Sequence, residues 1–70
     1  MKKRSITIAG HRTSITLEEP FWLELKAIAT RNNQGLSALV SQIDATRDLT
    51  INLSSALRLY VLAQLKNQTA

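Results

Sequence analysis

The tripeptide Ser-Ile-Thr occurs twice near the start of the chain, at residues 5–7 and again at residues 14–16. Isoleucine and threonine are stiff at χ1 and fit a pleated surface, so both copies favour a β-strand. A strand alternates its side chains between two faces with a period of two, and the two copies are an odd number of residues apart. One straight strand would therefore send Ile6 and Ile15 to opposite faces. The repeat excludes a uniform strand in which both isoleucines are buried on the same side.

The alternation must shift between the two copies if their isoleucines are to be buried together. Residues 9–11 are the obvious place, because Gly10 permits a bulge or a turn. Two conformations of residues 1–11 are open: a strand extension that continues or folds back on the second copy, or a mobile basic arm. We favour the strand, because in an exposed arm the apolar side chains of Ile6 and Ile8 would remain in contact with water.

After residue 17 the spacing of the apolar residues changes from two to about 3.6, which is the period of a helix. Pro20 suits the first turn of such a helix, and Asn52 is a good N-cap for a later one. We expect a strand followed by three helices, over residues 12–17, 19–31, 36–46 and 53–66.

The chain has 70 residues and no cysteine. A single domain of this size, residues 1–70, buries only ~60% of its unfolded surface and is marginal without a disulfide, a metal or a partner. Disulfides and thiolate zinc sites are excluded, and His11 is the one histidine, so no metal and no cofactor is expected. The third helix carries apolar residues on both sides, which indicates burial against another subunit. We therefore expect an oligomer.

The net charge of the chain is +4, and its first twelve residues contain no acid. A basic segment of this kind suits a polyanionic partner, nucleic acid above all. A chain so short, with one histidine and no cysteine, offers no convergent catalytic pocket, so we expect no enzyme. We expect no secretory signal, because residues 5–14 are too polar for its apolar region, and no apolar run approaches the ~18 residues of a membrane span. These observations favour a soluble, cytoplasmic protein without membrane contact.

Three stretches of the chain form a recognisable pattern: Arg12-Thr13-Ser14-Ile15-Thr16-Leu17, then Phe21-Trp22 with Leu25, then Gly35-Leu36-Ser37-Ala38-Leu39-Val40. In its strand, its first helix and the start of its second helix, the chain thereby resembles the ribbon-helix-helix DNA-binding family (MetJ/Arc/CopG-like). The stretches AGHRTSITLEEPFW and NLSSALRLYVL are similar to a bacterial subgroup with an extra C-terminal helix.

The resemblance implies a mainly α fold with a short N-terminal β-strand, assembled as an intertwined homodimer. A strand over residues 12–17 without an intrachain mate would pair with the same strand of a second copy, giving an intersubunit antiparallel β-ribbon. In the family this ribbon lies in the major groove of double-stranded DNA. The matching positions that would read bases are Arg12, Ser14 and Thr16.

The family also holds a DNA phosphate at the N-terminus of its second helix, where free backbone N–H groups and the helix dipole attract an anion. The matching residues are Gly35, Leu36 and Ser37. The family usually has glycine at the exit of the first helix and serine or threonine two residues later, whereas this chain has Asn33 and Gly35. The phosphate site therefore depends on backbone donors here.

Two further groups of residues complete the expected site. The auxiliary DNA contacts are Lys2, Lys3, Arg4 and His11. The expected dimer core consists of Ile15, Leu17, Trp22, Leu25, Leu39 and Ile43.

These expectations combine into a sequence-specific DNA-binding protein, a transcriptional repressor associated with the nucleoid. Two alternatives stay open. The third helix could bind a second protein, as in an antitoxin-like interaction module, or the dimer could be an architectural DNA binder with little sequence preference.

Overall fold

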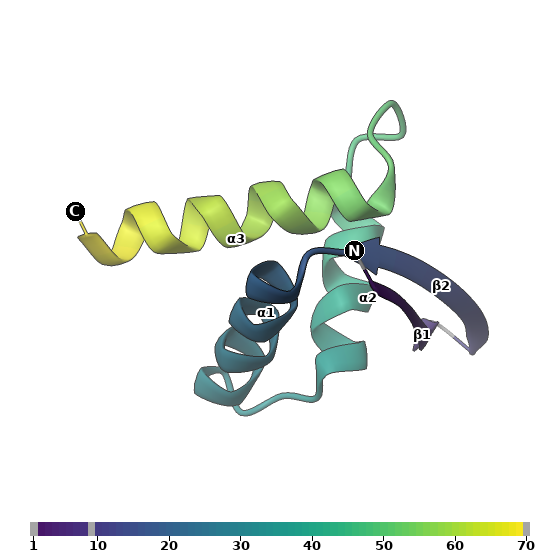
Figure 1. Ribbon diagram of the computed structural model, residues 1–70, viewed down its shortest axis with the longest axis horizontal. Helices are drawn as coiled ribbons and strands as arrows, with labels where there is room; N and C mark the ends of the chain where they lie inside the picture. Colours follow the sequence, from purple (N-terminus) through teal and green to yellow (C-terminus); the bar gives the residue numbers. More distant parts are fainter. Residues whose placement is uncertain (1, 9, 70) are drawn as a thin grey trace.

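The computed structural model describes residues 2–8 and 10–69, with the side chains of residues 3–8 and 10–67. A β-hairpin is followed by three helices (Figure 1). The elements are β1 (Lys2–Ile8), β2 (His11–Leu17), α1 (Glu19–Arg31), α2 (Leu36–Thr46) and α3 (Leu53–Thr69). This order confirms the mainly α class with a short N-terminal ribbon. The helix α3 ends three residues beyond the expected range.

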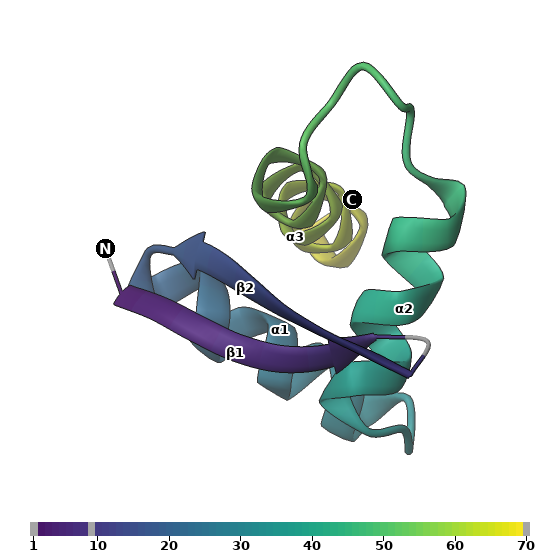
Figure 2. The same ribbon diagram turned by 90° about the vertical axis from the view of Figure 1, so that its right-hand side faces the viewer.

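The hairpin pairs the two Ser-Ile-Thr copies with each other. β1 and β2 form a two-stranded antiparallel sheet in which Ser5 lies opposite Ser14 and Ile8 lies opposite His11 (Figure 2). Gly10 lies in the turn with φ 82°, a left-handed conformation that glycine adopts readily. The expectation that β2 lacks a mate within its own chain is therefore wrong, because the first copy folds back onto the second. The strand interpretation of the N-terminal residues is confirmed.

The fold-back explains the odd spacing of the repeat. Residues directly opposite each other in an antiparallel pair share a face, so even positions of β1 lie beside odd positions of β2. The inward face consequently gathers the aliphatic side chains of both copies, all of them buried: Ile6, Ile8, Ile15 and Leu17. Burial of four aliphatic residues on one face fixes the register, since a slip of one residue would turn the two aliphatic side chains of the shifted strand to the opposite face.

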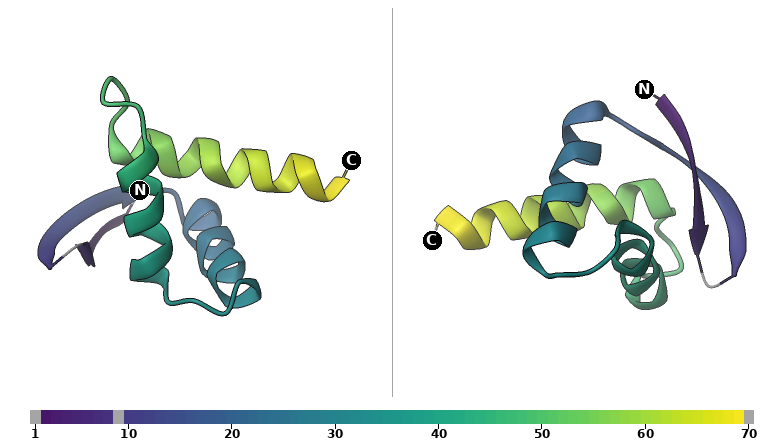
Figure 3. Two further views of the ribbon diagram at one scale, coloured as in Figure 1. Left: turned by 180° about the vertical axis from the view of Figure 1, so that it is seen from behind. Right: turned by 90° about the horizontal axis from the view of Figure 1, so that it is seen from below.

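The helices pack on the inward side of the hairpin (Figure 3). β1 contacts α2, and β2 contacts α3. One core runs through all the elements except the connections, and its buried residues are Ile6, Ile8, Ile15, Leu17, Leu25, Ile28, Ala29, Leu39, Val40, Ile43, Leu57 and Val61. Hydrophobic burial in a single chain therefore involves both strands and every helix.

The exit of α1 depends on Asn33, which has φ 54°. Asparagine tolerates this left-handed conformation better than most residues, and the backbone N–H of Asn33 donates to the carbonyl of Thr30 at 3.1 Å. The N–H of Gln34 donates to the carbonyl of Ala29 at 3.0 Å. This pair of bonds is the Schellman arrangement, so Asn33 fulfils the role that glycine usually has at this position in the family.

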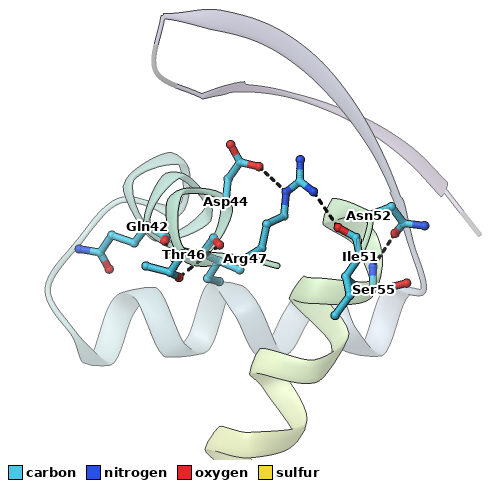
Figure 4. Close-up of polar contacts among 8 residues, drawn as sticks. Gln42, Asp44, Thr46, Arg47, Ile51, Asn52 and Ser55 are labelled. Carbon is cyan, nitrogen blue, oxygen red and sulfur yellow. Dashed lines mark hydrogen bonds and ion pairs between the residues drawn. The ribbon is translucent and has the colours of Figure 1, made fainter. Parts of the chain in front are cut away.

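Side chains fix the connection between α2 and α3 (Figure 4). Arg47 Nε donates to Asp44 Oδ1 at 2.8 Å, and Arg47 Nη1 donates to the carbonyl of Ile51 at 2.7 Å. Asn52 is the N-cap of α3, as expected, since its Oδ1 accepts from the backbone N–H of Ser55 at 2.9 Å. Arg47 therefore ties the last turn of α2 to the residue that precedes the cap of α3.

Candidate nucleic-acid interface

The outward face of the hairpin is entirely polar over its described side chains. The strand alternation that buries the aliphatic residues leaves six side chains on the opposite face: Lys3, Ser5, Thr7, Arg12, Ser14 and Thr16. Five of the six are exposed, and Thr16 is half-buried. Two are cations, four carry hydroxyl groups, and none is acidic. We call this set the outward face.

The structure places Arg12, Ser14 and Thr16 on the face where they were expected. Across the sheet, Thr7 lies opposite Arg12, Ser5 opposite Ser14, and Lys3 opposite Thr16. Sequence reasoning missed the contribution of Ser5 and Thr7, because it left residues 1–11 without a fixed register. The signal that could have found them is the repeated tripeptide together with a glycine three residues after the first copy, which is typical of a tight hairpin.

The two cations of the outward face, Lys3 and Arg12, differ from Arg47 and Arg58 in whether they form ion pairs. Among the described residues, Lys3 and Arg12 make no ion pair, whereas Arg47 and Arg58 pair with Asp44 and Glu18. Lys3 and Arg12 thus present unneutralised positive charge beside exposed hydroxyl groups.

Arg4 lies on the inward face and does not join the other cations. Its guanidinium forms an ion pair with Glu19 at the start of α1 and lies over the ring of Trp22, with Cζ 4.5 Å from the ring centroid. The register turns this side chain toward α1, away from the outward face, so the expected auxiliary DNA contact of Arg4 stays a prediction. Arg4 instead tethers β1 to the first helix. The side chain of Lys2, another expected contact, lies outside the described residues.

The residues expected in a dimer core are buried inside one chain. Leu17 and Leu25 have no exposed surface, and Ile43, the most exposed of the buried set, is 7% exposed. Ile15 and Leu39 are also buried, and Trp22 is half-buried with its ring under Arg4. Within the chain these residues belong to one core to which both strands and all three helices contribute, so their burial in one chain leaves their part in a dimer core a prediction.

His11 is exposed at the first position of β2. Together with Asn52 and Arg58 it lines a groove of about 630 Å³ between β2 and the start of α3. Arg58 Nε also donates to Glu18 Oε1 at 2.8 Å. This hydrogen bond lowers the pKa of Glu18 from its ordinary value. Arg58 therefore joins α3 to Glu18, the N-cap residue of α1.

The three expected phosphate-binding residues lie where α2 begins. Gly35 is the N-cap with φ −72°, and its carbonyl accepts from the N–H of Leu39 at 3.1 Å. Gly35 and Ser37 are exposed, and Leu36 is half-buried. The first backbone N–H groups of a helix have no partner within it, so this end of α2 offers donors to an anion.

The arrangement suits recognition of duplex DNA. A two-stranded ribbon fits the major groove, where base edges present both donors and acceptors. Hydroxyl groups can donate and accept, and a guanidinium can donate twice to guanine. Within residues 2–8 and 10–69, no three acidic, histidine or cysteine side chains gather as a metal site would require. None of the helices in the described part of the chain is long and apolar enough to cross a membrane.

A family model described as "Ribbon-helix-helix domain" matches residues 1–65 of the chain. Comparison with curated proteins gives no match, and comparison with solved structures gives none either.

Proposed function

The chain belongs to the ribbon-helix-helix domain family, a family of DNA-binding regulators, and from this we propose that it is a non-enzymatic, sequence-specific transcriptional repressor that binds double-stranded DNA. The observation that carries the proposal is the outward face. It combines two unpaired cations with four hydroxyl groups and no carboxylate on a ribbon of the width that the major groove admits.

Each part of the site has its own task in this proposal. Arg12 donates to guanine O6 and N7, while Ser14 and Thr16 donate to or accept from neighbouring base edges. A bidentate contact of this kind contributes roughly 1–3 kcal/mol of discrimination against a wrong base. The N-terminus of α2, with Gly35 and Ser37, holds a backbone phosphate and fixes the position of the ribbon on the duplex. Repression follows when the bound protein covers promoter DNA in the cytoplasm, at the nucleoid.

We propose in addition that the protein acts as a homodimer joined through α3. Leu59 is 54% exposed, Leu62 is 48% exposed and Leu65 is 38% exposed, and their spacing of three residues puts them along one side of the helix. A second copy offers the same apolar stripe, and mutual burial would remove both from water. Sedimentation of wild type and of a Leu59→Lys, Leu62→Lys double variant tests this. The wild type should be dimeric and the variant monomeric, and a monomeric wild type would contradict the homodimer.

The test of DNA recognition compares two duplexes over a series of salt concentrations. Fluorescence anisotropy measures binding to a labelled duplex from the region upstream of the protein's own gene and to a scrambled duplex of the same composition. A specific regulator binds the first duplex more tightly at every salt concentration. Arg12→Ala and Ser14→Ala should collapse this ratio, whereas Lys26→Ala, which removes an exposed cation from α1, should preserve it.

Three results would point elsewhere. Equal affinity for both duplexes would replace the repressor with a low-specificity architectural DNA binder. Absence of binding to either duplex at low salt would refute the proposed DNA-binding function. A wild type that neither binds DNA nor self-associates would favour the second candidate, an antitoxin-like module, because the exposed leucines of α3 would then be a surface for a different protein.

A further inference from the structure

The connection between α2 and α3 carries the most exposed of the large apolar side chains that the structure describes. Leu49 is 91% exposed. It lies in a turn closed by Asp48, whose carbonyl accepts from the N–H of Ile51 at 3.0 Å. The carboxylate of Asp48 also accepts from the backbone N–H of Thr50 at 2.9 Å and from its hydroxyl at 2.8 Å. The turn projects away from α1 and the hairpin (Figures 1 and 2). Its backbone is thus fixed by hydrogen bonds while its leucine stays in water.

An apolar groove of about 670 Å³ opens beside this turn. Its lining comes from the end of α2, from the connection and from the first half of α3, and its apolar members include Ala45, Ile51, Ala56, Leu59 and Tyr60. Leu59 is itself more than half exposed. The groove and the projecting leucine together form an apolar surface that a partner can remove from water.

We propose that this groove holds Leu49 of a second copy of the chain, and that each copy receives the leucine of the other. This inference rests on the homodimer proposed through α3. A two-fold dimer brings the same patch of both chains together, so a projection and a groove that adjoin on one chain can each meet their counterpart on the other. Asp48 and Ile51 lie on either side of Leu49 and also line the groove, so the two features do adjoin.

Two further observations favour a copy of this chain over another occupant. Leu59 belongs both to the groove and to the exposed leucine stripe of α3, so the groove continues the surface through which the homodimer is proposed. The charged side chains of the lining are Arg47 and Asp48, whose charges cancel, whereas the net charge of the chain is +4. Two copies can therefore approach each other at this surface without the repulsion between like charges that the rest of the chain would produce.

The exchange of leucines determines the direction in which the two α3 helices run. In an antiparallel pair centred on Leu62, the two Leu53 residues that begin the helices would lie about 27 Å apart at ~1.5 Å per residue. Each turn directly precedes its own α3, so the two turns would lie at opposite ends of such a pair, far from each other's groove. In a parallel pair the two turns lie side by side. The α3 helices of the dimer consequently run parallel, with the two-fold axis along them.

Sedimentation equilibrium of the full chain measures the contribution of Leu49 to the dimer. Each dimer buries two copies of this side chain, so Leu49→Ala should raise the dissociation constant of the dimer roughly 100-fold. Leu23→Ala is the matched control, because Leu23 is an exposed leucine of α1 outside the lining of the groove. It should leave the dissociation constant unchanged. Circular dichroism checks that both variants are folded, as their exposure predicts.

Disulfide trapping tests which residues of the two copies meet. The chain has no cysteine of its own, so each introduced thiol is the only one in its chain. Leu49→Cys is mixed with Ala45→Cys, which places the second thiol in the lining of the groove, and the mixture is oxidised. A mixed disulfide should form, and a size tag on one variant identifies it on a gel. Ala38→Cys, exposed near the other end of α2, is the matched control and should form no disulfide with Leu49→Cys.

Both results are required, and the failures can be told apart. If Leu49→Ala dimerises as tightly as wild type, or if the mixed disulfide with Ala45→Cys is absent, the exchange of leucines is overturned. When the Leu59→Lys, Leu62→Lys variant is nevertheless monomeric, the homodimer through α3 stands, and the groove is open to a different protein or to an apolar small molecule. If wild type itself is monomeric, the proposed homodimer falls together with the inference.

Discussion

Replacing Gly10 by alanine tests whether the hairpin turn requires the positive φ that glycine adopts at this position. Gly10 has φ 82°, and a Cβ added there would meet no atom within 4 Å. Gly35 offers a matched control, because a Cβ there would also meet nothing within 4 Å but its φ is −72°. The two substitutions add the same methyl group to equally open surroundings. They differ in whether an L-residue adopts the required φ without strain.

The expected effects can be derived from these two angles. An L-residue in the left-handed region is destabilised by ~1–2 kcal/mol, while alanine in place of glycine stabilises by ~0.4–1 kcal/mol through the unfolded chain. Gly10→Ala should therefore lower the free energy of unfolding by about 1 kcal/mol. For Gly35→Ala the same favourable effect is opposed by the weaker N-capping of alanine, so the net change should be near zero. In a domain of this size 1 kcal/mol corresponds to ~4–8 °C in Tm.

Thermal unfolding and urea unfolding, both followed by circular dichroism, measure the two variants against wild type. The chain is short enough for chemical synthesis, so D-alanine at position 10 adds a third comparison. A D-residue favours positive φ and should raise the Tm, because it retains the entropic benefit without the strain. A Gly10→Ala variant no less stable than Gly35→Ala, or a D-alanine variant less stable than the L-alanine variant, would refute the turn geometry.

Three further predictions concern the contacts that join the elements. Arg4→Ala should destabilise the fold by about 1 kcal/mol, since it removes a contact with Trp22 of roughly 0.5–1 kcal/mol and an exposed ion pair. A double-mutant cycle with Trp22→Leu measures the coupling energy of Arg4 and Trp22, and a coupling energy of zero would contradict the contact. Asn52→Ala should lower the stability of the fold by about 1 kcal/mol in urea unfolding, whereas Asn52→Ser, which keeps an N-cap oxygen, should stay close to wild type. Arg58 lowers the pKa of Glu18, so the stabilisation by this pair is present above the ~4.3 of an unfolded glutamate and is lost as pH falls through the lower folded pKa. Arg58→Met should therefore weaken the fall in the free energy of unfolding at acid pH. Parallel curves of unfolding free energy against pH for wild type and variant would argue against the pairing.

Local patterns were sufficient to predict the helices and the orientation of β2. The period of 3.6 after residue 17 and the capping asparagine at position 52 depend on neighbours in sequence, so their physical basis is visible in the chain itself. The alternation of Ile15 and Leu17 with Ser14 and Thr16 likewise determines which face is buried, whatever strand pairs with β2.

The mate of β2 could not be predicted from the same patterns. Folding β1 back and pairing β2 with a second copy would bury the same residues of β2, and alternation alone does not distinguish the two arrangements. The direction of the Arg4 side chain depends on which strand pairs with β2. Four cations near the N-terminus look alike as a basic segment, but once Ser5 lies opposite Ser14 the register turns Arg4 toward Trp22 and Lys3 toward solvent.

The pairing of β1 with β2 inside one chain affects how the outward face can change during evolution. In a ribbon of two identical strands encoded by one gene, every substitution appears in both strands, so the two strands can change only together. In this hairpin a codon change at Ser5 alters one strand and leaves Ser14 on the other as it was. The two strands are therefore free to diverge one residue at a time.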